Sequence, residues 1–129
     1  MRLSKYNLAF FTGSRSEYSL SKNIIKKLKK NKNKVYTIVS GTHLSAEHGN
    51  TYKEIINDNI KIDYKIKIDN LLKYNNNINL IISHITFKLN KILVKTAPDF
   101  IILTGDRFET LAAALCAYYL KIPIIHFHG

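Results

Sequence analysis

The sequence predicts an α/β protein built on a parallel sheet, and three observations support this prediction. Apolar runs of strand length alternate along the whole chain with segments whose apolar residues recur at helical spacing. Two of the apolar runs end in a glycine that is followed by a helix-start pattern. The length of 129 residues and the hydrophobic fraction of 46% suit one domain with a packed core.

The first third of the chain predicts a strand, a helix and a second strand. Residues 6–12 form an apolar run that suits a strand buried on both faces. Ser14 and Glu17 then have the spacing of a capping box, in which the N3 glutamate reaches back to the N-cap. The helix should end in a lysine-rich turn near residue 30, and residues 35–39 suit the second strand. The inward apolar stripe of this first helix is expected to consist of Leu20, Ile24 and Leu28.

The middle of the chain predicts a short helix and a strand at the edge of the sheet. The loop 40–44 follows the second strand and leads to a helical stretch at residues 51–57. Apolar and polar residues alternate strictly over residues 60–68, which is typical of a strand with one wet face. Residues 75–79 are rich in asparagine and suit a loop or the start of a helix.

The last part predicts two helices and two strands. Residues 78–93 follow the spacing of an amphipathic helix, which Pro98 closes, and residues 99–104 suit a buried strand. Residues 108–119 are apolar nearly all round, so this helix should be deeply buried or covered by another domain. Residues 123–127 suit a last buried strand. Right-handed crossovers then favour a Rossmann-like sheet with strand order 3-2-1-4-5.

The composition excludes some classes of protein. The net charge is +11, but 17 of the 20 basic residues are lysine, whereas phosphate-binding surfaces usually recruit arginine, so nucleic-acid binding is not favoured. The longest apolar runs are far shorter than the roughly 18 residues of a membrane span. Without a secretory signal pattern, and with Cys116 as the single cysteine, a cytoplasmic protein with a buried thiol is expected.

Two of the three arginines mark a candidate ligand site. Arg15 and Arg107 lie in the loops that follow the first and fourth strands, each just before or at the start of a helix. In a sheet of order 3-2-1-4-5 the strand order reverses between these two strands, which is where ligands bind. Free N–H groups at helix N-termini favour anions. A phosphate-bearing ligand is therefore expected, although neither loop matches GxGxxG or the ATP phosphate loop.

Other candidate residues have simpler interpretations that stay open. Asp106 could be an N-cap, with Glu109 at N3, and this role is compatible with a catalytic one. His43, Glu47 and His48 do not have the spacing of a strong zinc pattern, so no metal site is predicted. His126 and His128 should share one side of the last strand and border the crevice.

Five motifs follow one another along nearly the whole chain. They are Thr-Gly-Ser-Arg-Ser-Glu-Tyr at 12–18, Ser-Gly-Thr-His-Leu-Ser at 40–45, Gly-Asn-Thr-Tyr-Lys-Glu-Ile at 49–55, Thr-Gly-Asp-Arg-Phe-Glu at 104–109 and His-Phe-His-Gly at 126–129. Together these motifs resemble the hydrolysing UDP-N-acetylglucosamine 2-epimerases. The resemblance is strongest to the branch that serves sialic acid and to its relatives that act on diacetylbacillosamine nucleotides for legionaminic-type sugars.

The resemblance implies the role of several residues. Asp106 matches a family carboxylate credited with acid/base work, and Arg15 and Arg107 match residues that line the nucleotide-sugar site. Ser19 matches a further contact there, more weakly, and His43 matches a family histidine of the second loop and is grouped with the substrate-binding residues. The reaction removes the C2 proton as the nucleotide leaves C1, and then adds water, without a metal or redox cofactor.

The resemblance also implies a larger enzyme. Family members have two Rossmann-like domains in a GT-B-like arrangement that clamp a UDP-sugar, so residues 1–129 would form an incomplete N-terminal domain. The family continues His-x-His-Gly with Gly-Glu, whose glutamate is another presumed catalytic group. The isolated chain is therefore expected to be inactive, and the full-length protein to be a homo-oligomer. The alternatives are a fragment of a GT-B-type glycosyltransferase and a non-catalytic module that binds a sugar nucleotide or a partner.

Overall fold

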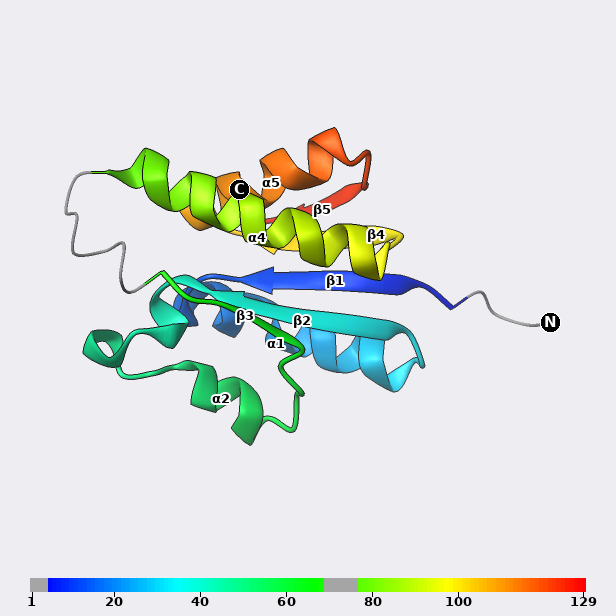
Figure 1. Cartoon of the computed structure of the whole chain (residues 1–129). Coiled ribbons are helices and arrows are strands. Elements are labelled where there is room, and N and C mark those ends of the chain that lie inside the picture. Colours follow the sequence, from blue (N-terminus) through cyan, green and yellow to red (C-terminus); the bar gives the residue numbers. More distant parts are fainter. Residues whose placement is uncertain (1–4, 69–76) are drawn as a thin grey trace.

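The computed structural model describes residues 5–68 and 77–129, which form a five-stranded parallel sheet with helices on both faces (Figure 1). The strand order is β3-β2-β1-β4-β5, as the sequence predicts. The elements are β1 (Asn7–Thr12), α1 (Arg15–Lys30), β2 (Lys34–Ser40), the 3-10 turns η1 (Gly41–Leu44) and η2 (Ala46–His48), α2 (Tyr52–Asn57), β3 (Tyr64–Ile66), α4 (Ile78–Thr96), β4 (Phe100–Thr104), α5 (Phe108–Tyr119) and β5 (Ile124–Phe127).

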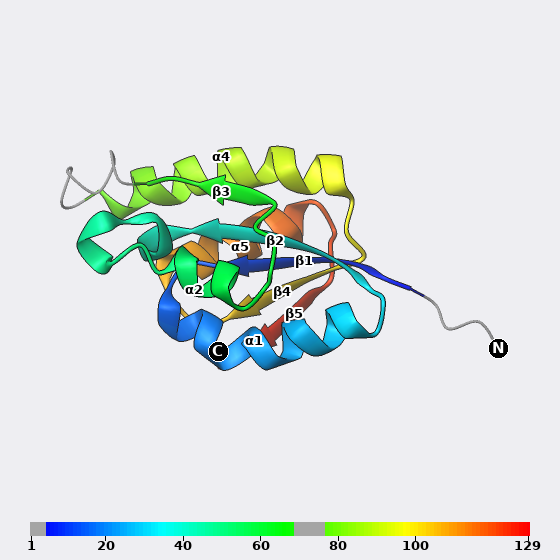
Figure 2. The same ribbon diagram turned by 90° about the horizontal axis from the view of Figure 1, so that it is seen from below.

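The sheet separates two hydrophobic clusters. Helices α4 and α5 cover one face, and α1 and α2 cover the other (Figure 2). Successive residues of β1 alternate between the two, because side chains of a strand point to opposite faces. Ala9 and Phe11 belong to the α4/α5 cluster, whereas Leu8 and Phe10 belong to the α1/α2 cluster. The prediction that β1 is buried on both faces is therefore confirmed.

Helix α1 is oriented differently from the sequence prediction. Tyr18 and Ile25 are its fully buried apolar residues, while Leu20 is 52% exposed and Ile24 and Leu28 are only partly buried. The expected stripe was therefore wrong by a rotation of the helix. The polar residues Glu17 and Ser21 also lie on the buried face. The Ser21 hydroxyl donates to the backbone carbonyl of Glu17 at 2.8 Å, which satisfies it inside the protein.

The edge strand β3 is shorter than predicted. Only Tyr64–Ile66 pairs with β2, although the alternation extends over residues 60–68. Ile60 packs in the α1/α2 cluster and Ile66 and Ile68 in the α4/α5 cluster, so the segment changes sides at the edge of the sheet. Asp63 fixes this change, because its Oδ2 accepts a hydrogen bond from the Thr37 N–H at 2.8 Å. Alternation alone does not reveal such a change of face.

Helix α4 matches the predicted amphipathic helix. Its buried residues recur at helical spacing, and it ends where Ala97 adopts a left-handed conformation (φ 42°) before Pro98. Of the asparagine-rich residues 75–79, which were expected to form a loop or helix start, residues 75 and 76 lie outside the described residues. None of the helices in the described ranges combines the length and the apolar character that crossing a bilayer requires.

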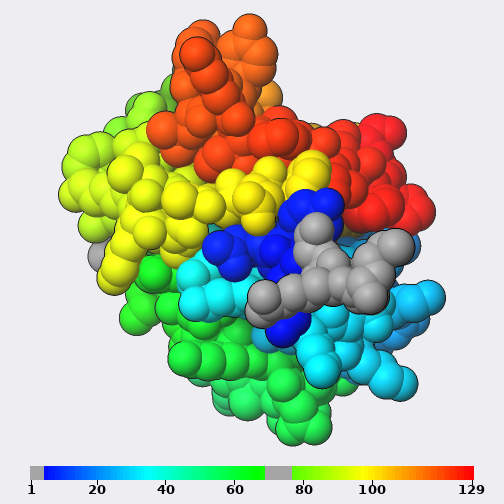
Figure 3. Space-filling model, turned by 90° about the vertical axis from the view of Figure 1, so that its right-hand side faces the viewer, coloured from blue at the N-terminus to red at the C-terminus, as the bar shows by residue number. Residues whose placement is uncertain are grey.

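Strand β5 is less buried than predicted, and helix α5, which was expected to be deeply buried or covered by another domain, has one exposed face. One face of α5 packs against α4 and the sheet, but Leu111, Leu115, Tyr118 and Tyr119 are exposed on the other. The end of α5, in orange, stands out from the surface in the space-filling view (Figure 3). Strand β5 pairs only with β4 in the sheet and is exposed or half-buried along its length. The prediction of a buried last strand is wrong, because an edge strand is covered on fewer sides.

Candidate functional site

The carboxyl ends of the strands surround a hollow of about 570 Å³. It brings together Arg15, Ser19 and Arg107, three of the five predicted site residues. The other two predicted residues, Asp106 and His43, are not among its lining residues: Asp106 is exposed beside Arg107 in the same loop, and His43 is buried. The loops after β1 and β4 are neighbours, as the strand order requires. The remaining lining residues are Ser14, Ser16, Thr42, His48 and Thr51.

Arg15 is the first residue of α1, and its side chain makes weaker contacts than that of Arg107. The Ser14 hydroxyl caps the helix by accepting from the Glu17 N–H at 3.4 Å. The Arg15 side chain is 68% exposed, and its Nε lies 2.8 Å from Glu54 Oε1 on α2. Within residues 5–68 and 77–129, the one ion pair of Arg15 is thus this exposed contact with Glu54.

Arg107 is held much more firmly, by Glu109. Its Nε and Nη2 each donate to a different carboxylate oxygen of Glu109 at 3.1 Å, which is the bidentate arrangement. The Glu109 side chain is fully buried, whereas that of Arg107 is 41% exposed. The hydrogen bonds to Glu109 raise the pKa of Arg107, so the guanidinium keeps its charge at the hollow.

Asp106 is not an N-cap. The N-cap position of α5 is occupied by Arg107, and no side chain caps the helix there. Asp106 is exposed, and none of the hydrogen bonds found among the described residues involves its carboxylate. The capping interpretation of Asp106 is therefore wrong. Its carboxylate is available to solvent or to a ligand.

His43 supports the loops from inside. Its ring is fully buried, with Nε2 2.9 Å from Thr12 Oγ1 and Nδ1 2.9 Å from Thr51 Oγ1. Burial lowers the pKa of His43 to about 4, so the ring is neutral at pH 7. His43 presents no exposed atom to a ligand in this structure. It connects the end of β1 with the turn before α2, and Thr51 itself lines the hollow.

Glu17 and Glu109 are buried functional candidates that the sequence interpretation treated only as cap residues. The Glu17 carboxylate accepts from the Gly13 N–H at 2.9 Å, one residue before the N-cap that a capping box would use. It also accepts from the Thr110 hydroxyl at 3.2 Å. Burial raises the pKa of Glu17, and the charge of Glu109 adds to this effect. The signal in the sequence was the pattern Thr-Gly-x-Arg-x-Glu, which occurs in both loops.

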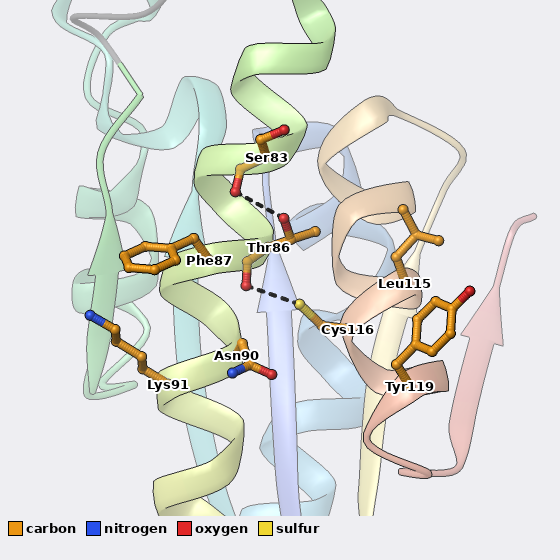
Figure 4. Close-up of a pocket in the computed structure, with 8 residues that line it drawn as sticks. All are labelled: Ser83, Thr86, Phe87, Asn90, Lys91, Leu115, Cys116 and Tyr119. Carbon is orange, nitrogen blue, oxygen red and sulfur yellow. Dashed lines mark hydrogen bonds between the residues drawn. The ribbon is translucent and has the colours of Figure 1, made fainter.

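A second hollow, of about 440 Å³, lies between α4 and α5 on the outer surface (Figure 4). Phe87, Leu115 and Tyr119 give it an apolar lining, and Lys91 is the one charged residue among the described residues that line it. Cys116 borders it and donates to the Thr86 carbonyl at 3.2 Å. Burial raises the pKa of Cys116 to about 11, as expected of a structural thiol. This hollow lacks the arginines and helix N-termini of the first.

Comparison with known proteins gives the family. The sequence profile described as UDP-N-acetylglucosamine 2-epimerase matches residues 26–129, which include Asp106, Arg107 and Glu109. The chain belongs to the UDP-N-acetylglucosamine 2-epimerase family. Arg15 lies outside the matched range. The resemblance inferred from the five motifs is thereby confirmed at the level of the family.

Individual members of the epimerase family share about a third of the chain's residues. The hydrolysing UDP-N,N'-diacetylbacillosamine 2-epimerase of Legionella pneumophila is 34% identical over 95% of this chain and 33% of its own length. The GDP/UDP-N,N'-diacetylbacillosamine 2-epimerase of Campylobacter jejuni is 32% identical over 98% of this chain and 33% of its own length.

A solved epimerase structure has the same fold. The UDP-GlcNAc 2-epimerase of Neisseria meningitidis, solved with UDP-GlcNAc bound, superimposes with a TM-score of 0.75 at 30% identity. The match covers 93% of this chain and 31% of that one. The chain thus spans about a third of the length of the epimerases it matches.

Proposed function

We propose that this chain forms the N-terminal domain of a hydrolysing 2-epimerase that acts on UDP-N-acetylglucosamine or on a related UDP- or GDP-diacetylbacillosamine. The observation that carries the proposal is the hollow at the carboxyl ends of the strands, where Arg15 and Arg107 meet. The membership of the chain in the UDP-N-acetylglucosamine 2-epimerase family supports the same chemistry. The products would be an N-acetylmannosamine-type sugar and the free nucleotide.

The two arginines suit the diphosphate of a sugar nucleotide. Arg15 begins α1 and Arg107 occupies the N-cap position of α5, so the positive ends of two helix dipoles point to the same hollow. Guanidinium groups bind phosphate oxygens in a bidentate manner. They would stabilise the negative charge that develops on the departing nucleotide. Ser19 also lines the hollow and can offer a hydroxyl to the same ligand.

Asp106 suits the proton transfers. Its exposed carboxylate is not used by the helix, and it lies next to Arg107 in the chain. In the proposed reaction a carboxylate removes the proton at C2, while the bond from C1 to the nucleotide oxygen breaks and a C1–C2 double bond forms. Water then adds its hydroxyl at C1, and a proton returns to the opposite face of C2. Acid/base groups typically contribute about 10²- to 10⁴-fold to such steps.

The remaining properties follow from the same proposal. The other two thirds of the enzyme would supply a second α/β domain and the Gly-Glu that follows the His-x-His-Gly pattern. The protein would be a cytoplasmic homo-oligomer whose products serve the synthesis of sialic- or legionaminic-type acids. The names of the Legionella and Campylobacter relatives support a diacetylated sugar nucleotide as one substrate candidate.

A release assay for the nucleotide tests the proposal. We expect the 129-residue chain alone to release no UDP from UDP-N-acetylglucosamine or UDP-diacetylbacillosamine, because half of the clamp is missing. A chimera in which this chain replaces the corresponding third of the Legionella pneumophila relative should release UDP. Turnover by the isolated chain would contradict the two-domain requirement. A folded chimera that binds UDP but releases none from either substrate would contradict the proposed activity.

A further inference from the structure

The loops after β1 and β4 share one sequence pattern and contact each other in a reciprocal way. Both read Thr-Gly-x-Arg-x-Glu, at residues 12–17 and 104–109. The glutamate of each loop lies against the glycine of the other. A Cβ atom added at Gly13 would lie 3.0 Å from Cβ of Glu109, and one added at Gly105 would lie 3.3 Å from Cγ of Glu17. Both glutamates are buried, with exposures of 4% for Glu17 and 0% for Glu109.

Glu109 also contacts the loop that follows β2. Gly41 has a left-handed backbone (φ 64°), and a Cβ atom there would lie 2.7 Å from Glu109 Oε1. The same Cβ would lie 2.3 Å from the Gly13 carbonyl oxygen, which accepts from the Thr42 N–H at 3.0 Å. Any side chain at Gly41 would therefore collide with its neighbours. The three loops that form the hollow thus meet at the Glu109 carboxylate.

The two loops differ in what their glutamates bind. Glu109 binds the arginine of its own loop through two hydrogen bonds of 3.1 Å. Glu17 instead accepts from the Gly13 N–H and the Thr110 hydroxyl, so that Arg15 is left to pair with Glu54. Arg107 is therefore preorganised by a buried partner, whereas Arg15 is not. Preorganised donors bind an anion without the cost of ordering the side chain.

We propose that Glu109 is a positioning residue, which orients the Arg107 guanidinium toward the diphosphate of the ligand and fixes it to the three loops around the hollow. This inference rests on the proposed function, because it assumes that a diphosphate binds there. Glu109 occupies only one edge of the guanidinium, the one formed by Nε–H and an N–H of Nη2. The 41% of the Arg107 side chain that remains exposed can face the ligand.

The chain offers a simple test, because it contains only three arginines. Labelling with [¹⁵N]arginine gives one Nε–H resonance each for Arg2, Arg15 and Arg107, and Arg107→Lys assigns one of them by its loss. In the wild-type chain the Arg107 Nε–H should exchange slowly with water. In Glu109→Gln that protection should be lost. Glu17→Gln is the matched control, since it removes a buried carboxylate that makes no hydrogen bond to Arg107, and it should keep the protection.

Titration with inorganic diphosphate tests whether the ordering of Arg107 by Glu109 affects binding. Diphosphate should shift the Arg15 and Arg107 resonances of the wild-type chain and leave that of Arg2 unchanged. Glu109→Gln should weaken diphosphate binding about tenfold, with the same circular-dichroism spectrum. In an Arg107→Ala background, Glu109→Gln should cause no further loss, because the two residues act as one unit.

Two results would overturn the inference, and they differ in what they say of the proposed function. If the wild-type chain binds diphosphate through both arginines, and Glu109→Gln binds it equally well, Glu109 has no positioning role and the proposed function stands. If diphosphate leaves the Arg107 resonance of the wild-type chain unchanged, the proposed ligand site fails and the inference fails with it.

Discussion

Arg15, which lines the hollow that should bind the ligand, forms an ion pair with Glu54, with 2.8 Å between Arg15 Nε and Glu54 Oε1. The pair connects the start of α1 with α2. Both side chains are substantially exposed, at 68% and 40%. Such pairs contribute only about 0–1 kcal/mol because water screens them. A diphosphate can therefore displace Glu54 from Arg15 at little cost.

We expect Glu54→Gln to strengthen the binding of UDP by up to about fivefold, since it releases Arg15 and removes a negative charge near the anion. Titration calorimetry with the 129-residue chain measures this. Glu47→Gln is the control, because Glu47 is exposed on η2 beside the lining residue His48 and forms no ion pair among the described residues. Weaker binding in Glu54→Gln than in Glu47→Gln would mean that Glu54 orients Arg15 for the ligand.

His43 should make the stability of the chain depend on pH below neutrality. Burial holds its folded-state pKa at about 4, below the usual 6.5. Above pH 6.5 the ring is neutral in both states, and its full contribution to stability is present. As the pH falls from 6.5 to 4 the unfolded chain takes up a proton that the folded chain does not. The free energy of unfolding should then fall by up to about 3 kcal/mol.

Urea unfolding of the wild type and of His43→Gln between pH 4.5 and 7.5 isolates this effect. The wild type should lose stability relative to the variant as the pH falls, although the variant is less stable at pH 7.5 because it lacks the Thr12 and Thr51 contacts. Burial raises the folded-state pKa of Glu17, so Glu17 makes the free energy of unfolding rise as the pH falls. This contribution is present in both proteins and cancels in the comparison. Parallel stability curves would show that His43 titrates normally in the folded chain.

The exposed face of α5 should promote self-association of the isolated chain. Leu111, Leu115, Tyr118 and Tyr119 form an apolar surface on one helix in a chain that otherwise carries a net charge of +11. We expect Leu111→Gln to reduce the associated fraction in sedimentation velocity. Leu20→Gln on α1 is the matched control, because Leu20 is exposed to the same 52% but lies on the other face of the sheet. An equal effect of both variants would exclude a specific role of α5.

The sequence predicts the arrangement of the two arginine loops because this depends on strand order alone. Buried parallel strands connected by right-handed crossovers leave few topologies, and these place the loops after β1 and β4 side by side. The complete burial of Glu109 could not be predicted in the same way. It depends on Gly13 and Gly41, which are distant in sequence and make room for its carboxylate only in the folded chain.

The errors in the predicted elements have related causes. Alternation over residues 60–68 identifies buried positions but not the cluster that each joins, so the change of face at Asp63 is invisible in the sequence. The apolar composition of α5 indicates that most of its surface should be buried, but it does not tell whether this chain or another domain covers that surface. The rotation of α1 accompanies the burial of Glu17 and Ser21, whose partners are backbone groups and the distant Thr110 hydroxyl, and no local sequence pattern reveals these partners.

Asp106→Asn should separate catalysis from stability in the chimeric enzyme. The exposed carboxylate caps nothing, so the change should alter the free energy of unfolding by no more than about 0.5 kcal/mol. An amide cannot accept the C2 proton, and turnover should fall about 10²- to 10⁴-fold with little change in UDP affinity. Asp63→Asn is the opposite control. It weakens the hydrogen bond to the Thr37 N–H and should cost on the order of 1 kcal/mol of stability while turnover is kept. Wild-type turnover in Asp106→Asn would exclude Asp106 as the group that moves the proton, and would leave that role to a carboxylate elsewhere in the enzyme.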